Sequence, residues 1–146
     1  MKIFLSLLLL IVASISLLHA ENWTTDYKAA LAQAKQQNKL VLLDFTGSDW
    51  CGFCKLLDKE VLSNSSFKNF LAKNFVPVTI DFPRGTKLPD ALVQQNDTLQ
   101  EQFKIDGFPT LIVVDANGKE VGRTEGYQPG SGPKTMIDQL QGFIKK

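Results

Sequence analysis

The sequence has 146 residues, and its 16 basic and 15 acidic side chains leave a formal net charge of +1. No basic stripe runs along it, which argues against nucleic acid as a partner. Beyond its first twenty residues the chain is long enough to bury one hydrophobic core. That part holds no segment long and apolar enough to enter a membrane, so we expect a domain that is not membrane-embedded.

The first twenty residues have the pattern of a secretory signal peptide. Lys2 supplies a positive start, residues 3–18 are apolar apart from three serines, and Ala20 offers a small residue for cleavage. The alternative is an uncleaved N-terminal anchor, although the apolar run is shorter than the ~20 residues of a spanning helix. We therefore predict export to the periplasm, or secretion, of a monomeric domain formed by residues 21–146, in which basic and acidic residues balance.

In the first half of this domain the sequence pattern predicts two strands and three helices. Apolar residues recur at helical spacing within residues 21–38, and Thr24 to Asp26 offer caps for that helix. Residues 40–45 are apolar at nearly every position, which is typical of a strand covered on both faces. Helices are expected from Cys51 to about Leu62 and after Asn64, which can cap the second of them. Residues 75–82 follow as a strand with Pro77 near its start.

The second half is punctuated by proline and glycine. We predict a short helix over residues 90–94, opened by Pro89, and a separate helix over residues 97–105. A strand at 110–115, a hairpin turn at 116–119 and a strand at 120–124 come next. An amphipathic helix over residues 133–145 closes the chain. This order indicates an α/β fold with a central mixed sheet of about four to five strands and helices on both faces.

Two cysteines, Cys51 and Cys54, are the only ones in the sequence. As a structural staple their four-residue loop would contribute only about 2 kcal/mol. Zinc wants four ligands, yet residues 21–146 contain no histidine, and haem attachment needs a histidine where Lys55 stands. The missing histidine also removes a cysteine–histidine nucleophile. We therefore expect no metal and no cofactor other than the cysteine pair itself.

Reversible dithiol–disulfide exchange is the chemistry that this pair favours. Cys51 is expected in the first turn of a helix, where free backbone N–H groups and the helix dipole stabilise a thiolate. Lowering a thiol pKa from about 8.5 to about 7 raises its ionised fraction at neutral pH to about half. Cys51 is thus the candidate nucleophile, and Cys54, one turn later, is placed to resolve a mixed disulfide.

The segment from Trp50 to Lys55, Trp-Cys-Gly-Phe-Cys-Lys after an apolar strand, resembles the active-site segment of the thioredoxin superfamily. Gly107-Phe108-Pro109-Thr110 is similar to the cis-proline segment of that family. Asp44 matches its buried carboxylate, and Gly126 falls where the family has a glycine. The resemblance covers about residues 40–143 and implies a thioredoxin fold.

The resemblance also implies roles for individual residues. Pro109 would be cis beside the cysteine pair, leaving the Phe108 backbone free to pair with an extended substrate; the alternative is an ordinary trans proline. Asp44 would be the buried acceptor of the Cys54 proton, with its pKa raised by desolvation, or else a strand-end residue bonded to nearby backbone. Trp50 would shield the dithiol and help to dock substrates, or else be a plain core aromatic. The substrate-binding candidates are Trp50, Phe53, Phe108 and Thr110.

Four features depart from thioredoxins proper. Gly52-Phe53 replaces Gly-Pro between the cysteines, and the turn at residues 46–49 is one residue longer. The lysine that thioredoxins place near the buried acid is missing, with Pro77 the nearest match, and the segment 82–96 is longer. These features resemble exported, thioredoxin-like bacterial proteins, including soluble relatives of periplasmic disulfide-reductase domains.

The sequence therefore predicts an exported protein-disulfide oxidoreductase that acts on protein thiols and disulfides. Reduction or isomerisation is favoured, because strong oxidants of this fold keep a histidine where Phe53 stands. A dithiol kept reduced outside the cytosol needs a donor, which implies a membrane thiol-reducing partner. One alternative is a thioredoxin-like binding or chaperone module whose dithiol is not catalytic. Another is a maturation factor with the same chemistry and a dedicated client.

Overall fold

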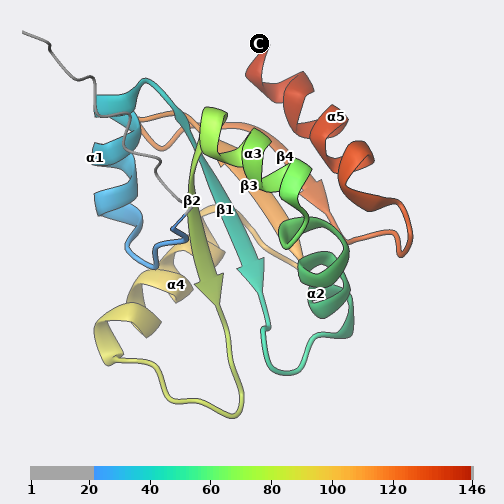
Figure 1. Cartoon of the computed structure of the whole chain (residues 1–146). Coiled ribbons are helices and arrows are strands. Elements are labelled where there is room, and N and C mark those ends of the chain that lie inside the picture. Colours follow the sequence, from blue (N-terminus) through green and yellow to red (C-terminus); the bar gives the residue numbers. More distant parts are fainter. Residues whose placement is uncertain (1–21, 146) are drawn as a thin grey trace, which may run out of the picture.

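The computed structural model describes residues 22–145, so the predicted signal peptide lies outside the described residues. Its centre is a mixed sheet of four strands: β1 (Leu40–Thr46), β2 (Phe75–Asp81), β3 (Thr110–Val114) and β4 (Glu120–Glu125). Their spatial order is β2-β1-β3-β4, with β1 parallel to β2 and antiparallel to β3, and with β4 antiparallel to β3 (Figure 1). This is the mixed sheet that the order of elements predicted.

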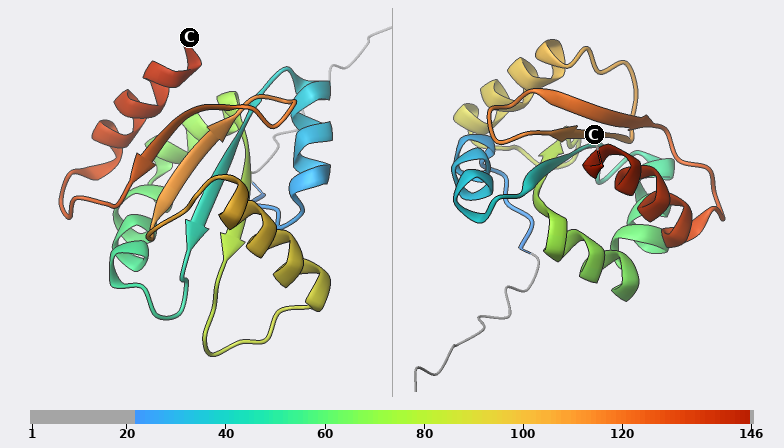
Figure 2. Two further views of the ribbon diagram at one scale, coloured as in Figure 1. Left: turned by 180° about the vertical axis from the view of Figure 1, so that it is seen from behind. Right: turned by 90° about the horizontal axis from the view of Figure 1, so that it is seen from above.

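Helices cover both faces of this sheet (Figure 2). They are α1 (Tyr27–Gln37), α2 (Gly52–Leu57) continuing into the π-helical turn η1 (Asp58–Leu62), α3 (Ser65–Asn74), α4 (Asp90–Gln102) and α5 (Gly132–Ile144). Buried residues of α1 and α4 share one apolar cluster, whereas those of η1, α3 and α5 share another on the opposite face. None of these helices, within residues 22–145, has the length and apolar character needed to cross a bilayer.

Strand β1 is buried on both faces, as its continuous apolar pattern predicts. Successive side chains of a strand point to opposite faces. Val41, Leu43 and Phe45 accordingly belong to the cluster under α1 and α4, whereas Leu42 belongs to the cluster under η1 and α3. Asp44 shares the face of Leu42, which directs it towards the helices that follow the cysteine pair.

The predicted caps and the position of the strand proline are confirmed. The carboxylate of Asp26 accepts the N–H of Ala29 at 2.9 Å, and Asn64 caps α3 in the same way. The Pro77 carbonyl accepts the N–H of Thr24 at 3.1 Å on the outer edge of β2. The nitrogen of Pro77 lies on that same side, so its missing N–H removes no bond to β1.

The prediction of two helices between residues 90 and 105 is wrong. A single helix, α4, runs from Asp90 to Gln102. Asn96, which lies between the two predicted helices, is 2% exposed, and its side-chain amide donates to the Asp81 carbonyl at 2.9 Å. Because a tertiary hydrogen bond takes up this amide, it does not compete with the helix backbone. The helix ends at Gln102, before Lys104 with its φ of +53°, and not at residue 105 as predicted.

Candidate active site

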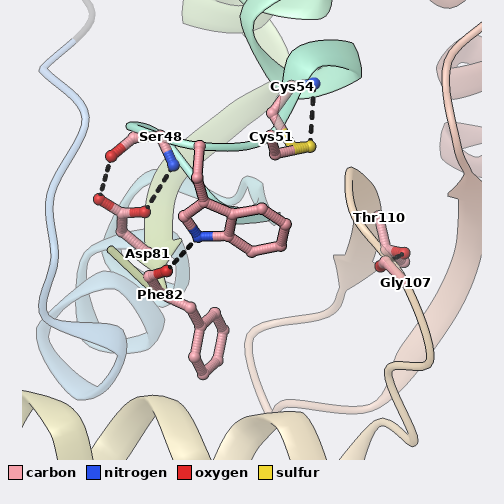
Figure 3. Close-up of a disulfide and its surroundings, with 8 residues drawn as sticks. Ser48, Cys51, Cys54, Asp81, Phe82, Gly107 and Thr110 are labelled. Carbon is pink, nitrogen blue, oxygen red and sulfur yellow. Dashed lines mark hydrogen bonds between the residues drawn. A yellow bond between two sulfur atoms is a disulfide. The ribbon is translucent and has the colours of Figure 1, made fainter. Parts of the chain in front are cut away.

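The cysteine pair lies at the carboxyl end of β1, where the chain turns into α2. The N–H of Cys51 donates to the Gly47 carbonyl at 2.8 Å and closes this turn. Gly47 is buried against the indole of Trp50 so closely that an added Cβ would overlap the ring. Figure 3 shows the pair between Ser48 and Asp81 on one side and Gly107 and Thr110 on the other.

Cys51 and Cys54 form a disulfide, with Cα atoms 5.2 Å apart. Cys51 is the N-cap of α2, and its Sγ accepts the backbone N–H of Cys54 at 3.2 Å. In the reduced protein the same Sγ would be a thiol or thiolate, and a donated N–H stabilises the thiolate form. Both residues are largely buried, with Cys51 7% and Cys54 4% exposed. The predicted placement of Cys51 at the start of a helix is confirmed.

Asp44 is a buried carboxyl group on the same side of the sheet. It is 6% exposed, and its Oδ1 has no hydrogen-bond partner among the described residues. Burial, together with the negative charges of Asp58 and Asp81, raises the pKa of Asp44 to about 7. Asp44 and Cys54 line one pocket of about 270 Å³, with Lys55 and Asp58 also in its lining. A group that ionises near neutral pH is therefore placed beside the second cysteine.

Trp50 is held at the surface and is not a core aromatic. Its indole N–H donates to the Phe82 carbonyl at 2.8 Å, and its ring meets Phe108 edge-on with centroids 5.8 Å apart. The guanidinium carbon of Arg84 lies 3.8 Å from the ring centroid, a cation–π contact. Phe53 is the more exposed aromatic, with 55% of its surface accessible. Of the aromatic residues predicted to contact substrates, Trp50 and Phe53 adjoin Cys51 and Cys54 in sequence, and Phe108 packs against Trp50.

The segment after β2 also belongs to the site, although the sequence pattern assigned none of its residues a part in the dithiol chemistry. The Asp49 carboxylate accepts the backbone N–H groups of Arg84 and Gly85, and these two bonds lower the pKa of Asp49. Ser48 donates its N–H and hydroxyl to the Asp81 carboxylate. Ser48 and Asp49 are residues that commonly bond to nearby backbone, so the sequence signal indicated a local turn. Their actual partners are distant in sequence and could be found only in the folded chain.

The predicted proline segment lies across the site. The Phe108–Pro109 peptide bond is cis, the isomer that the resemblance implies. The Pro109 carbonyl accepts the N–H of Gly126 at 2.8 Å, where a φ of +73° suits glycine. Thr110 is 3% exposed, and its hydroxyl donates to the Gly107 carbonyl at 2.8 Å. Its side chain therefore holds the loop in place and presents almost no surface, while the predicted contact of Thr110 with substrate stays a prediction.

No group of three or more histidine, cysteine or acidic side chains in residues 22–145 is arranged to hold a metal ion.

Comparison with known families agrees with this geometry. The model of the thioredoxin-like domain family matches residues 27–141. The chain belongs to the thioredoxin superfamily. Within that superfamily it is a thiol–disulfide oxidoreductase, and it works through a cysteine pair.

The chain is similar in sequence to two curated bacterial proteins and in structure to one solved oxidoreductase. The chain is 41% identical over 119 residues to the disulfide bond reductase DsbH of Chlamydia pneumoniae, covering 82% of this chain and 70% of that protein. It is 33% identical to the thioredoxin-related protein DsbJ of the same organism, covering 69% of this chain and only 29% of DsbJ. A solved structure of a DsbH oxidoreductase superposes with a TM-score of 0.79 at 36% identity, over 85% of this chain and 84% of that one.

Proposed function

We propose that this thioredoxin-superfamily member is an exported protein-disulfide reductase or isomerase. One observation carries the proposal: Cys51 caps α2 with its Sγ receiving a backbone N–H, while Cys54 shares a pocket with the buried carboxyl group of Asp44. The first cysteine is thus placed to act as a thiolate, and the second is beside a proton acceptor. Residues 21–146 would form the working domain after removal of residues 1–20.

In the first step the Cys51 thiolate attacks one sulfur of a client disulfide. A bond forms between Cys51 Sγ and that sulfur, the client S–S bond breaks, and the released client thiolate takes up a proton. The N–H of Cys54, which donates to Cys51 Sγ at 3.2 Å, favours the thiolate before the attack.

In the second step Cys54 resolves the mixed disulfide. Its thiol gives its proton to the Asp44 carboxylate, and its sulfur then attacks Cys51 Sγ. The Cys51–Cys54 disulfide seen in the structure forms, and the client sulfur leaves and is protonated. Two electrons have passed from the protein dithiol to the client disulfide. Asp44 suits this role because its pKa of about 7 lets it both accept and return a proton near neutral pH.

The client would dock on the aromatic rim of the site. Trp50 and Phe108 form an edge-on pair, and Phe53, between the two cysteines in sequence, is exposed on α2. The backbone at Phe108, next to Pro109, would pair with an extended client segment, and Thr110 would hold that loop. Protein clients suit this surface better than small disulfides, because the rim offers apolar area beyond the reacting sulfurs.

Two observations favour electron flow from the dithiol of this protein to the client disulfide. The relative DsbH is named a disulfide bond reductase. In this chain Phe53, which cannot donate a hydrogen bond to a thiolate, stands between the cysteines. A reductase working in the periplasm needs a source of electrons, and we assign that role to a membrane thiol-reducing partner. The protein itself would act as a monomer.

Insulin reduction with dithiothreitol as the electron source tests the activity. We expect turnover by the wild-type protein and none by Cys51→Ser, whereas Cys54→Ser should accumulate a mixed disulfide visible by mass spectrometry. The reduction potential of the pair, titrated against glutathione and dithiothreitol, tests the direction. A value near −270 mV, about that of thioredoxin, supports a reductase, and one near −120 mV, about that of the strongest oxidants, makes the protein an oxidant.

A binding or chaperone module is the second candidate, and the exposed Phe53 ring is the observation that favours it. The variant Cys51→Ser separates the two functions. If suppression of client aggregation survives in Cys51→Ser while wild-type protein reduces no insulin, the dithiol is not the working part and the binding module becomes the better description.

A further inference from the structure

A second depression lies between the loop that follows β2 and helix α4; we call it the α4 groove. Its volume is about 250 Å³, and its apolar walls are Phe82, Pro83, Leu88 and Val93. Pockets for small molecules and cofactors usually measure roughly 300–1,000 Å³. A groove this small, open and apolar suits one large side chain of a bound polypeptide better than a free ligand.

The groove is continuous with the surface beside the cysteine pair. The Phe82 ring lies against the Phe108 ring with centroids 5.3 Å apart, and the Phe108 ring meets Trp50 at 5.8 Å. Trp50 directly precedes Cys51. Figure 3 shows the labelled Phe82 side chain extending from the end of β2 towards α4, away from the cysteines. A client segment lying on the aromatic rim therefore reaches the α4 groove without crossing a polar gap.

The walls of the groove are held in place by hydrogen bonds to the active-site turn and to the sheet. Phe82 donates its N–H to the Thr46 carbonyl at 2.9 Å and accepts the Trp50 indole N–H at 2.8 Å. On the helix side, buried Asn96 donates to the Asp81 carbonyl at 2.9 Å. A preformed groove binds at a lower entropic cost than one that must be ordered by its ligand.

The exposure of Val93 in the groove is not explained by the packing of the fold. Val93 is 42% exposed, and the other large apolar side chain that is exposed within residues 22–145 is Phe53. Its neighbours Gln94 and Ala91 on α4 are exposed as well. An aliphatic side chain at this position adds little to the core of this chain, whereas it would gain burial against a bound partner.

We propose that the α4 groove binds an apolar side chain, aromatic or branched aliphatic, of the client segment whose disulfide is exchanged at Cys51. The groove would select clients by one residue of the client, which lies a few positions before or after the client's own reacting cysteine. This inference rests on the proposed function and adds the chemistry of the client segment to it.

Glutathionylated peptides test the proposal. Each would carry one cysteine in a Gly/Ser background, with a single Phe placed in turn at the positions on either side. For the reduced wild-type protein we expect Phe at a subset of positions to raise kcat/KM by about tenfold over the Phe-free peptide. The variant Val93→Glu should bring that ratio close to one. Gln94→Glu adds the same charge to the next exposed residue, outside the groove, and should leave the ratio unchanged.

Three results overturn the proposal: no position of Phe raises kcat/KM, the two variants give the same ratio, or Val93→Glu keeps the wild-type ratio. Thermal unfolding of both variants checks that each is folded. If the wild-type protein reduces none of the peptides, the proposed function fails separately. The groove is then tested by NMR on the oxidised protein with a Phe-bearing peptide that has serine for cysteine. Shifts of the amides lining the groove, lost in Val93→Glu, support it; their absence contradicts it.

Discussion

Asp44 and Cys54 line the same pocket, although one is in the central strand and the other is in the helix that follows it. Burial brings the pKa of Asp44 to about 7, so its ionisation falls in the range where the enzyme would work. This relationship leads to predictions about both stability and catalysis.

Replacing Asp44 by asparagine should stabilise the oxidised protein at high pH. In the unfolded chain Asp44 ionises near 3.8, and in the folded protein near 7. The folded state therefore binds more protons between these values, and wild-type stability falls as pH rises through them, with the full penalty present above pH 7. Asparagine carries no such penalty. We expect Asp44→Asn to gain up to about 4 kcal/mol in free energy of unfolding at pH 8.

Urea unfolding of the oxidised proteins at pH 4 and pH 8 measures this effect. The gain should shrink to about 0.5 kcal/mol at pH 4, where the carboxyl group is protonated in the folded protein and only about half ionised in the unfolded chain. An equal gain at both pH values would mean that the effect of the substitution is steric and not electrostatic.

The same substitution should slow the resolving step. Without a carboxylate to accept the Cys54 proton, we expect the attack of Cys54 on the mixed disulfide to slow by about 10²-fold near pH 7. In the wild-type protein the rate of this step should rise with pH around 7, as Asp44 ionises, and this limb of the pH profile should vanish in Asp44→Asn. Rapid acid quenching of single turnovers with a disulfide peptide follows the step, and an unchanged pH profile would remove Asp44 from it.

The negative charge of Asp58 should affect the pH at which Asp44 ionises. Asp58 lines the same pocket, and its negative charge raises the pKa of Asp44. Asp58→Asn should therefore move the pH midpoint of the resolving step downwards. Glu101→Gln is the matched control, because Glu101 is an exposed acid on α4, which covers the opposite face of the sheet. Equal shifts in both variants would point to a general effect of net charge.

Gly47 should be intolerant of even a methyl group. A Cβ there would overlap the indole of Trp50, which is tied to the Phe82 carbonyl. We expect Gly47→Ala to cost about 1–3 kcal/mol in free energy of unfolding and to lower kcat/KM for protein clients by displacing Trp50. Gly142→Ala is the control: it lies in α5 with nothing within 4 Å of an added Cβ, so it should stabilise by roughly 0.5–1 kcal/mol. A stable Gly47→Ala with wild-type activity would show that the indole can move freely.

Much of this protein can be read from its sequence, because the relevant physics is local. The apolar run of β1, interrupted by Asp44 alone, predicts burial on both faces, and a cysteine after a strand and turn predicts the first turn of a helix, whose N-cap Cys51 is. The absence of histidine from residues 21–146 argues against the usual zinc and haem sites, and the spacing of Cys51 and Cys54 favours thiol exchange.

Other features depend on contacts between distant parts of the chain, which no local pattern encodes. Two helices were predicted on either side of Asn96, yet α4 continues through it, and the Asn96 amide donates to the Asp81 carbonyl. Trp50 and Asp49 likewise form hydrogen bonds with the segment after β2. These bonds require the ends of the parallel strands β1 and β2 to lie side by side, which only the folded sheet provides. The carboxyl group of Asp44 obtains its raised pKa from desolvation by the surrounding fold and from Asp58 and Asp81. Residue types therefore determined the chemistry of this protein, and tertiary packing decided the pKa of Asp44 and the surface beside the cysteines.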